Sequence, residues 1–236
     1  MIYITFINEQ QQELTHLHTQ GIKRADADAK IIYISKDPLK TPNGTLNIYG
    51  IDITQQGYKS FLSLLTTLKL LGEQHNENMC ITSVTTIFRN NIKDAWQSNK
   101  CKVMGFMNNT SVLPLKNVFC IHLDIVKRVI DYLSQKQYWD LFNRDAMEVL
   151  QGLALIVANA SEVKLFQCVM PNGDAALFGF YNGMFYTNTE RLNTVYLCVE
   201  CDNLPYLQGY LQAHLDIIAA IKRAMQHCLH TWKKRI

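Results

Sequence analysis

Two pairs of metal-binding residue types stand out in the last forty residues, a Cys-x-x-Cys followed by a His-x-x-His. Cys198 and Cys201 form the first pair, and His227 and His230 form the second. Two thiolates and two imidazoles are a ligand set that binds structural zinc in a tetrahedral arrangement. Whether they form such a site depends on the elements that hold them.

The elements predicted around these residues keep the two pairs apart. The segment TVYLCVEC (194–201) is typical of a strand, on which residues three positions apart point to opposite faces. From Pro205 to His227 the pattern predicts one helix of about 22 residues, which is roughly 33 Å long. We therefore predict no metal site within one chain. Cys198 and Cys201 stay weak candidates for a site shared in an oligomer, or for one formed through a break of the helix near Gly209.

The histidine pair belongs instead to a basic face of the predicted C-terminal helix. Arg223, His227, His230 and Lys234 line up opposite the apolar stripe. Such a face could bind phosphate, nucleic acid or the carboxylate of a partner. The alternative is a solvated surface whose cations complement the dipole at the end of the helix.

A second chemical pattern lies at Glu162 and Lys164, which open a predicted strand. Glu-x-Lys is half of a pattern in which a carboxylate binds Mg²⁺ and a lysine stabilises the attacked phosphate. The pattern also needs an aspartate on a preceding strand, and the nearest, Asp145, lies on a predicted helix. Asp28 and Lys30 form a similar pair before another strand, equally unsupported.

A third pattern is the alternation of Cys120, His122 and Asp124. On a straight strand these side chains share one face, where a thiol and an imidazole could act as nucleophile and base. Alternate positions lie about 6–7 Å apart, which is too far for direct proton transfer. Asp124 is also well placed to cap the following helix, so we do not assign a cysteine enzyme.

Aromatic residues cluster around a predicted tight turn at Asn182-Gly183. Asn-Gly favours the positive φ angles of two-residue hairpins. An ordinary packed core and an exposed surface for a partner or a small molecule both fit this set, which comprises Phe178, Phe180, Tyr181, Phe185 and Tyr186.

The elements of the first half are predicted from periodicity and turn residues. Strands are expected at 1–7, 29–35, 45–53 and 101–107, and helices at 9–21, 55–74 and 83–99. The helix at 55–74 has the clearest apolar face, with the three-and-four spacing of Tyr58, Phe61, Leu62, Leu65, Leu68 and Leu71.

The second half is predicted to contain a strand at 117–123, helices at 124–142 and 144–160, two hairpins in series, another strand and the long helix. We therefore predict an α+β fold in which an antiparallel β-meander is packed by helices and followed by a long amphipathic C-terminal helix. A smaller α/β-type N-terminal half precedes it. The regions are 1–110 and 115–236, or together one compact domain.

Composition sets the remaining limits. The chain has 236 residues, of which 48% are hydrophobic and 18% charged, as in a compact protein. The net charge of +3 makes no general case for nucleic acid or membrane binding. No signal segment is visible and no apolar run approaches about 20 residues, so we expect a cytoplasmic protein of microbial origin. The seven cysteines are expected to be reduced and to pack as small hydrophobes.

These observations favour a non-enzymatic role, because no glycine-rich phosphate loop or nucleophile motif is present. We predict an accessory, adaptor or regulatory protein that acts through protein contacts, without a cofactor. Its partner would be another protein or a second copy in a homodimer. Nucleic-acid or phosphate binding through the basic helical face is the alternative, and a Mg²⁺-dependent phosphodiesterase is the second alternative.

Overall fold

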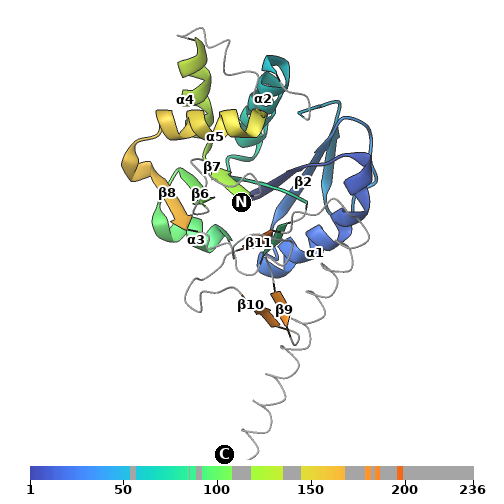
Figure 1. The fold of residues 1–236 in the computed structure, drawn as a ribbon. Coiled ribbons are helices and arrows are strands. Elements are labelled where there is room, and N and C mark those ends of the chain that lie inside the picture. Colours follow the sequence, from blue (N-terminus) through green and yellow to red (C-terminus); the bar gives the residue numbers. More distant parts are fainter. Residues whose placement is uncertain are drawn as a thin grey trace, which may run out of the picture.

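The structure is a computed structural model that describes residues 1–53, 57–84, 86–88, 92–107, 118–134, 145–167, 179–181, 184–186 and 196–198. A seven-stranded sheet forms its centre (Figure 1). In spatial order the strands are β3 (Leu46–Tyr49), β2 (Lys30–Ser35), β1 (Ile2–Phe6), β4 (Met79–Thr82), β7 (Val118–Ile121), β6 (Val103–Met107) and β8 (Val163–Gln167). Only β7 runs opposite to its neighbours β4 and β6, and the other neighbouring strands of this sheet pair in parallel.

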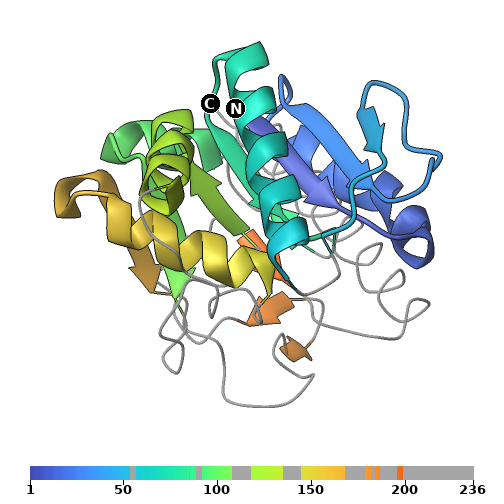
Figure 2. The same ribbon diagram turned by 90° about the horizontal axis from the view of Figure 1, so that it is seen from above.

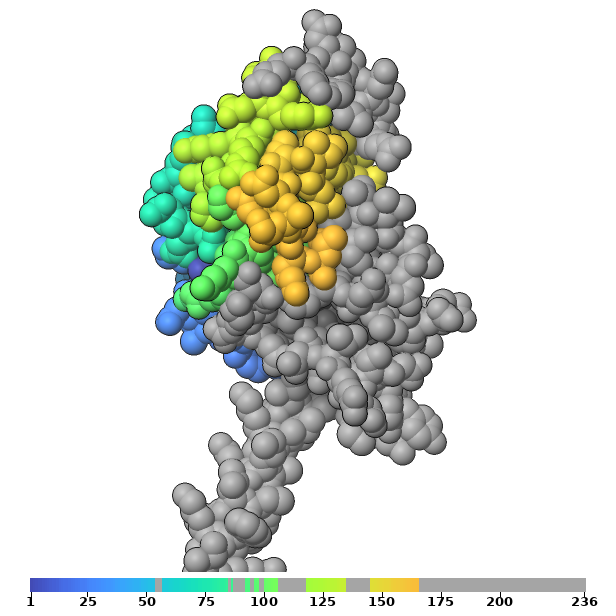
Figure 3. All heavy atoms as spheres, turned by 90° about the vertical axis from the view of Figure 1, so that its left-hand side faces the viewer, coloured from blue at the N-terminus to red at the C-terminus, as the bar shows by residue number. Residues whose placement is uncertain are grey.

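Three helices cover one face of this sheet: α2 (Tyr58–His75), α4 (Leu123–Ser134) and α5 (Ala146–Val157) (Figures 1 and 2). They share an apolar core with alternate residues of the strands, such as Ile2 and Ile4 of β1 and Ile32 and Ile34 of β2. Figure 3 shows α4 between α2 and the segment 145–167 on the outside of this layer. β1 and β2 are buried on both faces of the sheet, which explains why most of their residues are apolar.

The opposite face carries a more polar layer beneath η1 (Glu9–Leu14) and α1 (Thr15–Ala25). The Tyr33 hydroxyl of β2 donates a hydrogen bond to the carbonyl oxygen of Thr15 over 3.0 Å. It also lies 3.0 Å from His18 Nδ1 and 2.9 Å from Thr19 Oγ1. Burial of His18 lowers the pKa of its imidazole to about 3, so the ring is neutral in the folded protein.

The described part of the chain contains further short elements. They are β5 (Thr86–Phe88), α3 (Ile92–Asn99), η3 (Ala160–Glu162), β9 (Gly179–Tyr181), β10 (Met184–Tyr186) and β11 (Tyr196–Cys198). β9 and β10 pair as the hairpin predicted around Asn182-Gly183. β11 pairs with β5, more than a hundred residues earlier in the chain.

The predicted fold class is wrong. In place of an antiparallel meander, the structure has a mostly parallel sheet with helices against it. The strand that should begin the meander, β8, is parallel to β6 in the main sheet, and the strand that should end it, β11, is antiparallel to β5. The predicted C-terminal helix lies outside the described residues.

One structural feature crosses the predicted division at 110–115. β4 pairs with β7, so a single sheet contains strands from both regions. β4 is absent from the sequence prediction, and β5 occupies part of a segment predicted to be helical.

Within the described residues, no helix is both long enough and apolar enough to cross a membrane.

Candidate functional site

A cavity of about 720 Å³ lies at the carboxyl ends of β1 and β2 and beside the segment that follows β3. This volume is in the range typical of small-molecule sites, roughly 300–1,000 Å³. In open α/β sheets, ligands bind outside the carboxyl ends of the parallel strands, where the loops meet. Both its size and its position therefore make this cavity the candidate site.

The first wall is the turn from β1 into η1. The backbone N–H of Ile7 donates to the carbonyl oxygen of Ile34 over 2.8 Å, which holds the turn beside the end of β2. Asn8 then caps η1. Its Oδ1 accepts the N–H of Gln11 at 3.0 Å, and Gln11 Oε1 accepts the N–H of Asn8 at 3.2 Å. This reciprocal capping box fixes the residues that enter the cavity.

The second wall is the segment after β2. Ser35 Oγ donates to the carbonyl oxygen of Asp37 over 2.7 Å, and Asn47 Nδ2 donates to that of Leu39 over 2.7 Å. The third wall is the segment after β3. This segment begins with a turn at Gly50, whose φ of +89° suits glycine. Beyond it the N–H of Ile51 donates to the carbonyl oxygen of Ser35 over 3.1 Å. The three strand ends are therefore joined by hydrogen bonds into one frame.

The lining combines an apolar part with groups that mostly accept hydrogen bonds. The apolar residues are Phe6, Ile7, Ile34, Pro38, Leu39, Ile51 and Ile53. The polar residues are Asn8, Glu9, Gln10, Gln11, Ser35, Lys36, Asp37, Asp52 and Asp145. With four carboxylates and one ammonium among them, the lining suits hydroxyl-bearing groups better than a cluster of phosphates.

Asp145 reaches this cavity from the helical layer. Its carboxylate caps α5 by accepting the N–H groups of Met147 at 2.9 Å and Glu148 at 3.3 Å. Asp145 is thus a helix cap that also borders the cavity. Its role as the missing metal ligand of a Glu162-Lys164 nuclease site is not supported, because Glu162 lies elsewhere.

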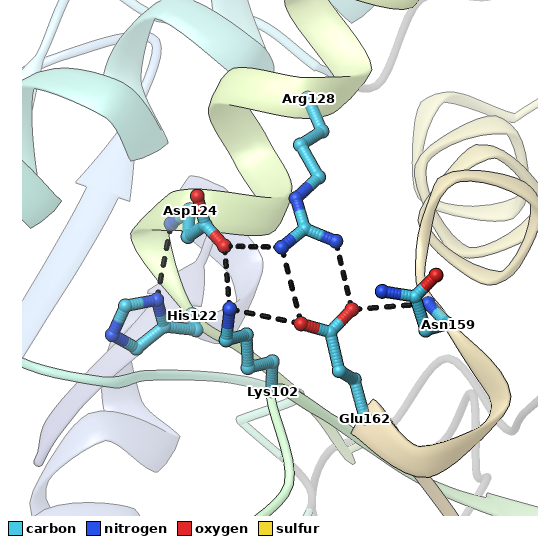
Figure 4. A network of polar contacts seen from close by, with 6 residues as sticks. All are labelled: Lys102, His122, Asp124, Arg128, Asn159 and Glu162. Atoms are coloured by element: carbon cyan, nitrogen blue, oxygen red, sulfur yellow. Dashed lines mark hydrogen bonds and ion pairs between the residues drawn. The ribbon is translucent and has the colours of Figure 1, made fainter.

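Glu162 belongs to an ion-pair network at the opposite, amino-terminal edge of the sheet (Figure 4). Lys102 immediately precedes β6, Glu162 immediately precedes β8, and Asp124 and Arg128 lie in α4. Arg128 and Lys102 contact both carboxylates over 2.7–2.8 Å. These cations, Arg128 first, hold the pKa of Glu162 at about 2. The network joins α4 to the starts of two strands and balances two negative with two positive charges.

The Cys120, His122 and Asp124 pattern also has a structural explanation. Cys120 is fully buried in β7, and His122 Nδ1 accepts the backbone N–H of Asp124 over 3.1 Å at the start of α4. Burial, the largest cause, raises the pKa of the Cys120 thiol, so it is a poor nucleophile. His122 is therefore a helix cap, and Asp124 is a member of the ion-pair network.

We expect Glu162→Gln to lower the melting temperature by several degrees, because the change leaves two cations facing one carboxylate. Glu73→Gln is the matched control, since Glu73 pairs with Lys127 on the surface, where an ion pair contributes little. Differential scanning calorimetry of both variants near pH 7 makes the comparison. Equal effects of the two changes would contradict the structural role of the network.

The other predicted site residues are only partly placed. Six of them lie outside the described residues, namely Phe178, Cys201, Arg223, His227, His230 and Lys234. Phe180 and Tyr181 belong to β9, Phe185 and Tyr186 to β10, and Cys198 to β11, where only the backbone is described. Among the described side chains, no three of His, Cys, Asp or Glu are grouped so as to hold a metal ion. Cys80, Cys101 and Cys120 are buried free thiols, as predicted.

The residues around the cavity were missed because each strand end looks ordinary by itself. Asn8 with Gln11 is a recognisable capping box, and Asp37-Pro38 is a recognisable turn. Nothing in either pattern shows that the two loops meet. The only usable signal is topological: β1 and β2 are consecutive parallel strands, so their carboxyl ends lie at the same edge.

The comparisons with known proteins find similarity in structure alone. No family model matches the chain, and no curated protein matches its sequence. The apo form of the glycosyltransferase GlyE from Streptococcus pneumoniae TIGR4 superimposes with a TM-score of 0.53 and 9% identity, over 94% of this chain and 63% of that one. The chain thus spans less than two thirds of the length of GlyE. Galactosyltransferase LgtC, in complex with donor and acceptor sugar analogs, gives a TM-score of 0.46 at 12% identity, over 70% of this chain and 73% of that one.

The fold likeness to GlyE overturns the prediction of an adaptor or regulatory protein. That prediction was based on the absence of catalytic motifs, on the predicted packing and on the aromatic hairpin, whereas the chain has an α/β fold like that of GlyE. The basic helical face of the first alternative lies outside the described residues. Glu162, on which the second alternative depends, is paired with Lys102 and Arg128.

Proposed function

We propose that the chain binds a sugar nucleotide in the cavity at the carboxyl ends of β1 and β2, and that it acts as a glycosyltransferase. The observation that carries the proposal is the cavity itself, about 720 Å³ in volume and lined by three strand ends. The likeness of the fold to GlyE supports the same reading by analogy.

The lining indicates how such a ligand would lie. Asp37 follows β2, the strand next to β1, and a carboxylate in this position suits the hydroxyls of a ribose. Phe6, Ile34 and Ile51 offer apolar surface to a base or a sugar ring. Because carboxylates outnumber cations, we place the uncharged, hydroxyl-bearing part of the ligand inside, with the exposed Lys36 as the cation closest to the phosphates.

Two properties expected from the sequence stay proposals beside this one. We propose a cytoplasmic location, where sugar nucleotides would be available to the cavity. A protein partner, or a second copy of the chain, is also still a proposal, and the native mass of the purified protein tests it.

Asp37→Asn is expected to weaken sugar-nucleotide binding by about 10-fold or more, because a charged hydrogen-bond acceptor contributes roughly 1.5–3 kcal/mol. Isothermal titration calorimetry with uridine, guanosine, adenosine and cytidine diphosphate sugars gives the affinities. Asp28→Asn is the matched control, since Asp28 is an exposed aspartate before β2, away from the cavity. Absence of binding to the whole panel, or equal affinities of the two variants, would refute the assignment.

Release or transfer of the sugar distinguishes an enzyme from a binding protein. We expect the wild-type protein to convert the bound sugar nucleotide to the nucleoside diphosphate, slowly to water or faster to an added acceptor. Chromatography of the nucleotide products measures this conversion. If the protein binds the sugar nucleotide but converts none of it with any of a range of glycan acceptors, the binding site is supported and the assignment as an enzyme is wrong.

A further inference from the structure

Two cysteines face each other across the middle of the central sheet. In the antiparallel pair of β4 and β7, Cys80 lies directly opposite Cys120. Their strand neighbours Met79, Ile81, Phe119 and Ile121 all point into the apolar core under the helices. Because strand residues alternate, both cysteines point to the other face of the sheet, where Tyr3 is the register partner of Cys80.

The two thiols influence each other. After burial, the neighbouring Cys80 side chain is the next cause that raises the pKa of the Cys120 thiol. Directly opposed residues of antiparallel strands have Cα atoms about 4.5–5.5 Å apart, and disulfides span about 4.4–6.8 Å. The backbone therefore already has the spacing that a disulfide needs.

Burial decides when such a bond can form. Cys80 and Cys120 have no exposed surface, so no oxidant reaches them in the folded protein. The thiolate is the reacting form, and the raised pKa of Cys120 keeps that thiol protonated in the folded protein. During folding, or after separation of β4 from β7, both thiols are exposed to solvent.

We propose that Cys80 and Cys120 are a latent disulfide pair, which forms a cross-strand bond between β4 and β7 when the chain folds in the presence of a disulfide oxidant. With glutathione disulfide, one thiolate attacks the oxidant and releases one glutathione thiol. The second thiolate then displaces the other glutathione. The protein loses two hydrogens, one S–S bond forms as another breaks, and two glutathione molecules are reduced.

The bond would lock two strands of the sheet and then be shielded by the same burial. The chain could thus exist as a reduced and as a locked, more stable form, according to the redox state in which it folds. This inference goes beyond ligand binding in the cavity and does not depend on it.

Refolding the full chain in two arms tests the pair. One arm contains reduced glutathione only, and the other contains a mixture of oxidised and reduced glutathione. After alkylation of free thiols, trypsin digestion without reduction gives peptides 70–89 and 117–127, each with a single cysteine. We expect these two peptides to be joined in the oxidised arm only, and the melting temperature of that arm to be several degrees higher.

The control is Cys101→Ala, which removes the other buried thiol among the described residues and should leave the joined peptides in place. Cys120→Ala should abolish them. If the Cys120→Ala variant does not fold, the presence or absence of the joined peptides in the wild-type protein is sufficient to test the proposal. Alkylation of both cysteines in folded, oxidised protein overturns the proposal. So does linkage of either peptide mainly to other cysteines, or a failure to fold only in the oxidised arm.

Discussion

Replacing His18 with asparagine is expected to flatten the loss of stability that the wild-type protein undergoes as the pH falls below 6.5. The pKa of His18 is about 3 in the folded protein and near 6.5 in the unfolded chain. Between these values the unfolded chain binds a proton that the folded protein does not. The contribution of the neutral His18 ring to the free energy of unfolding is therefore fully present above pH 6.5. It is lost as the pH falls toward 3, by up to about 1.4 kcal/mol per pH unit.

Urea unfolding at several pH values between 6.5 and about 5.5 measures this slope above the range in which the carboxylates of Glu77 and Glu162 contribute. Their pKa values are about 2 in the folded protein, so their own loss of stability begins only as the pH approaches the unfolded-state value of roughly 4.3. Asparagine can still donate to the Tyr33 hydroxyl from the position of Nδ1 but does not titrate in this range. His16→Asn is the control, because His16 is exposed on the same helix. If the slope survives in His18→Asn, or disappears in His16→Asn, the buried neutral histidine is not its cause.

Phe61→Ala is expected to reduce the free energy of unfolding by roughly 3–5 kcal/mol, the range for deleting a buried phenylalanine ring. Phe61 lies in α2 with only 1% of its surface exposed, and it belongs to the core between the helices and the sheet. Urea titration followed by circular dichroism measures the loss.

The adjacent Leu62 is the matched control, because the sequence places it on the same apolar face of the helix. The structure leaves 37% of its surface exposed. Leu62→Ala should therefore cost less than about 1 kcal/mol. A loss as large as that of Phe61→Ala would show that Leu62 is covered and that the helix is packed differently.

Local elements were predicted well wherever periodicity reflects burial. β1, β2, β3 and α2 lie within the predicted segments to within a few residues, because their apolar patterns and turn residues are local. Four residues of the predicted apolar face of α2 are buried, namely Phe61, Leu65, Leu68 and Leu71. Tyr58 and Leu62, at the edges of that face, are exposed.

Strand pairing could not be predicted in the same way. β4 is four residues long and buried on both faces, so it shows neither alternation nor the length of a helix. Without β4, nothing connects the two halves of the sheet. Likewise β8 and β11 look like neighbours of the real hairpin β9–β10, but they pair with β6 and β5, and partners distant in sequence leave no mark on the local pattern.

The candidate site was missed for a related reason. Sequence patterns identify chemistry when the residues stand close together in the chain, as in Cys198-x-x-Cys201 or Glu162-x-Lys164. The cavity is lined by three separate loops, of which Asn8, Asp37 and Asp52 are representative, and by Asp145 from the helical layer. Such a site becomes visible only once the order and direction of the strands are known.

The central claim is that a sugar nucleotide binds at the carboxyl ends of β1 and β2. Hydrogen–deuterium exchange with and without a saturating sugar nucleotide tests it most directly, because the method locates the bound ligand. We predict slower exchange at residues 7–11, 36–39 and 51–53, with no change around Lys102 and Glu162 at the opposite edge. Protection confined to other segments, or none with any sugar nucleotide, would contradict the assignment of the cavity.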